Sequence, residues 1–297
     1  MRTSPDPADR LGLSLAALSA ATWALAGVWV RLLPGVPLAT IVAGRLALAL
    51  VALAPLAWVW RERLRLTPAT WGLATLMVAY YGCAVAAFRF TAVAEGTLFI
   101  NISPLFAVAW AVARGEAVRR GEAWGTALAL AGVAVILAPS ALEASGAAQD
   151  RLIGDALALL AALGMAAYAI SFSRLRGADR APEPLAVTLL TFGLGAVAAL
   201  GLWAVQGDAA LVGLDSPASW GALIALAVIT TAIPTFAYSV ASHRLPPILA
   251  TTVRLLTPAF AAVAAWLVLG EVPSAWLIPG GALVLGGLLL SVRAKAA

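Results

Sequence analysis

The sequence is poor in charged residues. Only 11% of its 297 residues are Asp, Glu, Lys or Arg, whereas a soluble globular domain carries about 25%. Hydrophobic residues make up 63% of the chain, and the mean hydropathy is +0.97. A water-soluble fold of this composition would lack the polar surface needed to cover its core. The composition therefore predicts an all-α integral membrane protein.

Metal-ligating and nucleophilic residues are also scarce. The chain has one histidine, His243, and one cysteine, Cys83. This excludes most metal sites that are rich in nitrogen and sulfur ligands, and a lone cysteine excludes an internal disulfide. The sequence shows no phosphate-binding loop and no Ser-His-Asp set. We therefore expect no cofactor, no metal and no enzymatic activity.

The net charge of +5 does not indicate a nucleic-acid partner, because the basic residues are scattered and form no block. Cytoplasmic loops of membrane proteins are enriched in Lys and Arg. Placing both termini in the cytoplasm puts most of the arginines on that side, while the acidic residues divide evenly. The charges therefore predict a multi-pass protein in the lipid bilayer with cytoplasmic N- and C-termini. We expect the membrane to be the plasma (inner) membrane of a bacterium.

What the sequence has instead is a series of long apolar runs. A membrane-crossing helix needs about 20 apolar residues, and about ten runs of this kind fit the chain, with prolines between them where a helix start tolerates proline. The predicted spans are residues 11–33, 38–60, 69–91, 96–114, 121–139, 152–173, 185–205, 217–242, 247–269 and 275–292.

One pattern of residues occurs twice, with the same spacing from its glutamate to its two glycines. The first copy has Pro104, Gly115-Glu116, Gly125 and Gly132, and the second has Pro258, Gly270-Glu271, Gly280 and Gly287. The feature-poor residues 142–150 divide the chain into two repeats, 1–141 and 142–297, with five predicted spans each. An odd number of spans inverts the second repeat in the membrane, so we expect two inverted five-helix repeats.

These residues carry a resemblance to a known family. The doubled pattern, the spacing of Trp23 and Arg31, and Gly154-Asp155 followed by Tyr168 resemble EamA-type members of the drug/metabolite transporter superfamily. The resemblance covers the whole chain. It implies a ten-helix bundle of inverted repeats whose members move small metabolites, often outward. Amino-acid exporters are the branch that we favour, with aromatic or other apolar amino acids as substrates.

Two prolines interrupt apolar spans at equivalent positions of the repeats. Pro104 and Pro258 each remove a backbone hydrogen bond, and corresponding interruptions in two halves of a transporter indicate a binding site. We predict that both are hinges; a packing kink without ligand contact is the alternative. Asn101 and Arg254 precede these prolines closely enough to share a helical face with them. For Asn101, pairing with the broken backbone or joining helices is the alternative to substrate contact.

Polar and aromatic residues within the spans form the predicted substrate site. An arginine inside a membrane indicates a functional site by default; Arg254 suits a carboxylate, with snorkelling as its alternative, and for Arg45 we favour snorkelling. Deep aromatic residues suit a mostly apolar zwitterion or a neutral metabolite, although core packing is their commoner use. The predicted substrate-binding residues are Trp23, Tyr80, Tyr81, Asn101, Tyr168, Tyr238 and Arg254.

The sequence therefore predicts a transporter that exports small metabolites by alternating access through a central cavity, as a monomer or weak homo-oligomer. An intramembrane enzyme is one alternative, but Asn101, Arg45 and Arg254 compose no known catalytic set. A channel or uniporter for small neutral solutes and a structural subunit are the others. Glu95 and Glu271 fall at span ends, as does Glu116, so facilitated diffusion is as compatible with the sequence as proton coupling.

Overall fold

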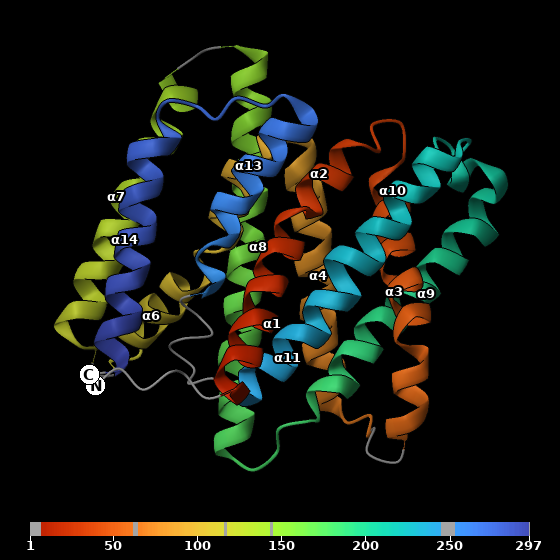
Figure 1. The fold of residues 1–297 in the computed structure, drawn as a ribbon, viewed down its shortest axis with the longest axis horizontal. Coiled ribbons are helices and arrows are strands. Elements are labelled where there is room, and N and C mark those ends of the chain that lie inside the picture. Colours follow the sequence, from red (N-terminus) through yellow and green to blue (C-terminus); the bar gives the residue numbers. More distant parts are fainter. Residues whose placement is uncertain (1–6, 62–64, 116–117, 143–144, 245–252, 297) are drawn as a thin grey trace.

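The computed structural model describes residues 7–61, 65–115, 118–142, 145–244 and 253–296, and within these ranges it is helical, with no strand (Figure 1). Its elements in chain order are α1 (Pro7–Ala24), α2 (Ala26–Arg31), α3 (Leu38–Trp60), α4 (Pro68–Phe90), α5 (Val93–Ile100), α6 (Ser103–Ala113), α7 (Arg120–Leu142), α8 (Gly146–Gly177), α9 (Pro184–Gln206), η2 (Gly207–Leu211), α10 (Pro217–Ala227), η3 (Val228–Ala232), α11 (Ile233–Arg244), α13 (Thr257–Leu269) and α14 (Leu277–Ala296).

Eight helical segments among the described residues are long and apolar enough to cross a membrane, and they overlap the first eight predicted spans. Two shorter apolar helices follow, at Thr257–Leu269 and Leu277–Ser291. The ninth predicted span, 247–269, begins at residues that lie outside the described part. The chain is thus a multi-pass membrane protein, as its composition predicts.

The outer surface of the bundle is apolar. Large hydrophobic side chains such as Val205, Val59 and Trp124 are at least 71% exposed. Exposed apolar surface of this extent is costly in water but suits contact with lipid chains. The surface therefore agrees with the composition in assigning these helices to the bilayer.

The two prolines of the repeated pattern each begin a helix. Residues 101–102 form a turn between α5 and α6, and residues 255–256 form a turn directly before α13. Pro104 and Pro258 lie in the first turn of the helix that follows, where the missing N–H costs nothing. The expectation that Asn101 shares a helical face with Pro104, and Arg254 with Pro258, is wrong, because a turn separates the members of each pair.

Helices α7 and α14 lie side by side (Figure 1), and glycines allow their backbones to touch. A Cβ placed on Gly132 would lie 2.5 Å from the carbonyl oxygen of Gly280, and one on Gly125 would lie 2.5 Å from that of Gly287. The two helices are antiparallel, because the contacting residue on α14 has a lower number when the residue on α7 has a higher one. Small residues are the usual means of such close packing in membranes.

The core continues across the break between α5 and α6. Phe99 of α5 and Leu105 of α6 are both buried in one apolar cluster with Ile136 of α7 and Leu288 of α14. The two short helices are therefore held by packing on either side of the turn that separates them.

Candidate substrate site

Three predicted site residues meet in the first cluster of the site. Trp23 lies at the end of α1, Tyr238 lies on α11, and Arg254 directly precedes the turn that leads into α13. The rings of Trp23 and Tyr238 have their centroids 5.4 Å apart. The Arg254 guanidinium carbon lies 5.0 Å from the Trp23 ring and 5.1 Å from the Tyr238 ring. Both distances are within the range of cation–π attraction.

A second arginine occupies a buried position on α3. Arg45 is 3% exposed, and its guanidinium carbon lies 4.8 Å from the centroid of the Tyr81 ring on α4. Its Nε donates a hydrogen bond to Thr231 Oγ1 at 2.6 Å, and its Nη2 donates to the Thr230 carbonyl oxygen at 3.3 Å. The preference for snorkelling at Arg45 is wrong, because the side chain finds its polar partners inside the bundle.

The partners of Arg45 are available because the eighth apolar segment is irregular. A π-helical stretch, Val228–Ala232, separates α10 from α11. Pro234 follows it and lacks the N–H that would bond to the Thr230 carbonyl in an α-helix. That carbonyl accepts from Arg45 instead. Single-turn π segments within α-helices are frequent at functional sites, and a proline within a threonine-rich segment was the available sequence signal.

Tyrosines connect the two arginines. Tyr80 and Tyr81 are neighbours on α4 with ring centroids 5.2 Å apart, and Tyr80 lies within electrostatic range of both Arg45 and Arg254. Tyr168 on α8 is in turn within electrostatic range of Tyr81. Six of the seven predicted substrate-binding residues thus gather between α1, α4, α8 and α11, which lie in the middle of the bundle (Figure 1).

Asn101 stands apart from this group in its described contacts. It ends α5, and its side-chain Nδ2 donates a hydrogen bond to the Thr97 carbonyl oxygen of its own helix at 2.8 Å. An amide removed from water needs a partner, and for the half-buried Asn101 a carbonyl of its own helix supplies one. A role for Asn101 in substrate binding stays a prediction.

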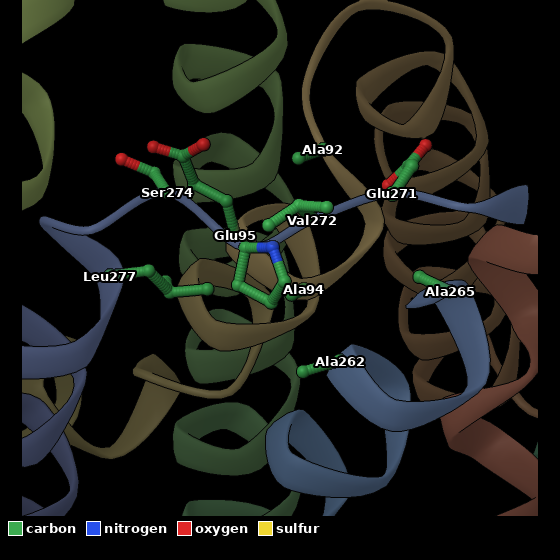
Figure 2. A pocket seen from close by; sticks show the side chains of 10 residues that line it. Ala92, Ala94, Glu95, Ala262, Ala265, Glu271, Val272, Ser274 and Leu277 are labelled. Atoms are coloured by element: carbon green, nitrogen blue, oxygen red, sulfur yellow. The ribbon is translucent and has the colours of Figure 1, made fainter. Parts of the chain in front are cut away.

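A separate network of charged residues joins the ends of several helices. Arg31 Nε lies 3.4 Å from Glu271 Oε1, and Arg31 Nη2 donates a hydrogen bond to the Thr91 carbonyl oxygen at 2.9 Å. Glu271 Oε2 accepts from the backbone N–H of Val93 at 3.0 Å. Figure 2 shows Glu271 beside a narrow pocket that Glu95 also lines. The glutamate of the second repeated pattern therefore ties α2 to the start of α5.

Two further carboxylates in this network are almost completely buried. Thr91 Oγ1 donates to Asp155 Oδ1 at 2.5 Å, and Arg151 Nε lies 3.4 Å from Glu95 Oε2. Asp155 and Glu95 are 1% and 2% exposed. Glu95 and Glu271, which the sequence places only at span ends, are thus paired with residues of neighbouring helices. Glu116 lies outside the described residues.

Comparison with known proteins identifies the family of this bundle. The EamA-like transporter family matches the chain twice, over residues 10–138 and 152–293. The chain belongs to the EamA-like transporter family. As an EamA-like protein it is a membrane transporter, and the family relationship implies a small-molecule substrate and favours a transporter over an intramembrane enzyme.

Individual proteins and a solved structure also resemble the chain. An uncharacterized transporter from Archaeoglobus fulgidus is 28% identical over 218 residues, which cover 73% of each chain. A second from the same organism is 27% identical over 220 residues, covering 73% of this chain and 72% of the relative. A crystal structure that is 18% identical matches with a TM-score of 0.66 over 96% of this chain and 97% of its own. At this identity the last similarity shows the fold alone.

Proposed function

We propose that this EamA-like protein exports small metabolites, with amino acids as the first class to test, by alternating access through a central cavity. The observation that supports this most is the cluster of arginines and aromatic residues in the middle of the bundle. Residues 1–141 contribute Trp23 and the tyrosine pair on α4, while residues 142–297 contribute Tyr168, Tyr238 and Arg254. A site shared by two halves is what alternating access requires.

The proposal includes two inverted five-helix repeats, with α13 and α14 completing ten crossings. The glycine contacts support it. Gly125 and Gly280 are the first glycines of the two repeated patterns, and Gly132 and Gly287 are the second. In each contact a first glycine meets a second one: Gly125 meets Gly287, and Gly280 meets Gly132. A two-fold axis between the repeats requires this reciprocity, and the double family match agrees with it.

Pro104 and Pro258 are proposed as the hinges of the two repeats. Each lies just beyond a two-residue turn, at 101–102 and at 255–256. A turn within a membrane segment absorbs a change in backbone angle more easily than a continuous helix does. The equivalent placement of the two breaks supports a motion that exchanges the conformations of the repeats.

The proposed substrate contacts follow from the geometry of Arg254. A guanidinium that lies over aromatic rings keeps its N–H edges available, and these edges bind a carboxylate bidentately. Trp23 and Tyr238 then cover the apolar part of the substrate. We place the protein in a bacterial plasma membrane with both termini cytoplasmic, as a monomer or weak homo-oligomer of the amino-acid-exporter branch.

Reconstitution into liposomes tests the function. We expect saturable uptake of one or more radiolabelled amino acids, together with counterflow when the liposomes are preloaded with unlabelled substrate. Arg254→Gln should abolish most of this uptake, while Trp220→Phe, at a partly exposed position in the first turn of α10, should leave it near normal. Flux that rises linearly with concentration and shows no counterflow would instead establish a channel.

A further inference from the structure

The central cluster carries two positive charges without a carboxylate. The described polar partners of Arg45 are the hydroxyl group of Thr231 and the carbonyl of Thr230. The guanidinium of Arg254 faces the rings of Trp23 and Tyr238. Neither arginine forms an ion pair with any residue in the described part of the chain.

Three carboxylates in the described part of the chain, two of them buried and Glu271 half-buried, are engaged elsewhere. Glu95 pairs with Arg151, Glu271 pairs with Arg31, and Asp155 accepts from Thr91. None of these partners belongs to the central cluster. These three carboxylates therefore do not neutralise Arg45 or Arg254. They also offer no negative charge to the ammonium group of a substrate bound beside the two arginines.

Electrostatic interactions in a medium of low dielectric constant decide which substrate charge such a site prefers. Arg45 is buried and Arg254 is half-buried. A guanidinium removed from water without a counter-ion is costly, and this cost falls when an anion binds next to it. An ammonium group in the same place meets two like charges, which repel it strongly where water is excluded. The aromatic side chains favour an apolar body for the substrate.

We infer that the site takes organic anions with an apolar body, such as 2-oxo acids, in preference to zwitterionic amino acids with the same carbon skeleton. The inference rests on the proposed transport of small metabolites and changes its substrate class: the carboxylate and the apolar body of the amino acid are retained, and the ammonium group is the part that the site disfavours.

Matched pairs of compounds that differ only at the amino carbon provide the test. In proteoliposomes that hold the full chain, phenylpyruvate is compared with phenylalanine, and 4-methyl-2-oxopentanoate with leucine. We expect each oxo acid to be half-saturating at a concentration at least about tenfold lower than its amino acid. Liposomes without protein correct for passive permeation.

Charge movement gives a second readout. A potassium gradient with valinomycin sets the membrane potential, and an inside-positive potential should speed uptake of the oxo acid while leaving that of the zwitterion unchanged. Arg254→Gln should bring the ratio of the half-saturating concentrations of amino acid and oxo acid close to one. Arg254→Lys, which keeps the charge, should retain most of the preference for the oxo acid. Size-exclusion profiles establish that both variants are folded.

The outcomes separate the inference from the proposed function. Equal or tighter binding of phenylalanine and leucine, with saturable uptake, overturns the inference and leaves the transporter in place. Failure of the folded protein to bind or carry any member of either pair overturns both. A preference that survives unchanged in Arg254→Gln also overturns the inference, because it excludes Arg254, the charge that faces the aromatic rings, as its cause.

Discussion

Arg45 on α3 donates a hydrogen bond to the hydroxyl group of Thr231, 186 residues away in the sequence, at 2.6 Å. The contact ties a buried cation to the irregular turn of the eighth apolar segment. Thr231 Oγ1 also lies 2.9 Å from the Leu226 carbonyl oxygen, to which it donates. Thr231 thus donates to a carbonyl of its own helical segment, which also accepts from Thr230 Oγ1, and accepts from a cation on a helix of the other half of the chain.

Removing this hydroxyl group should destabilise the protein. Thr231→Val keeps the shape of the side chain but leaves Arg45 Nε without its partner, which should cost about 1–3 kcal/mol. Thermal unfolding in detergent measures the loss. Thr75→Val is the matched control, because Thr75 makes only an exposed bond to the Trp71 carbonyl of its own helix. Equal unfolding temperatures for the two variants would show that Arg45 does not depend on Thr231.

The contact between α7 and α14 should tolerate no side chain at its centre. Gly132→Leu would drive a side chain into the backbone of Gly280, so we expect a reduced yield of folded protein and a lower unfolding temperature. Gly286→Leu is the control, because a Cβ at Gly286 meets nothing within 4 Å. Folded Gly132→Leu protein with unchanged thermal stability would count against α7 and α14 as a rigid support.

The tyrosine beside Arg45 should matter for transport. Tyr81→Ala removes the ring that faces the guanidinium, and Asn101→Ala removes an amide near the first helix break. If both act on substrate, each loss of about 1–3 kcal/mol weakens uptake roughly 5- to 150-fold. Uptake into proteoliposomes, corrected for folded protein, measures it, with Trp220→Phe as control. Unmodified rates in both variants for every tested compound would move the site elsewhere.

The orientation of the chain follows from its arginines. We expect residues 61–68, 114–121 and 174–184 in the cytoplasm and residues 140–151 outside, because Lys and Arg are retained on the cytoplasmic side. Single cysteines introduced at Ala178 and Gly146, in a background without Cys83, test this with an impermeant reagent on sealed cells. Labelling at 178 but not at 146 would invert the assignment.

The first eight predicted spans each overlap a helical segment that is long and apolar enough to cross the bilayer, because a long apolar run is driven into the bilayer whatever surrounds it. The sequence locates the helix breaks for a similar reason, since Pro104 and Pro258 act on their own backbone. It does not show that a turn precedes each proline, which removes the shared helical face expected for Asn101 and Arg254. Local chemistry fixes where a helix is interrupted, while packing on both sides fixes the shape of the interruption.

The candidate site likewise has one part that the sequence predicts and another that it does not. The aromatic residues Trp23, Tyr81 and Tyr238 are predictable, because large rings in the middle of a span are too deep for the membrane interface. The role of Arg45 is not predictable, because its burial depends on Thr231 and on the carbonyl that Pro234 leaves without a partner. The sequence by itself determined the membrane fold, through hydrophobicity and chain length. Only the tertiary structure decided which charges lie inside, because the free energy of a buried charge depends on partners that are distant in the chain.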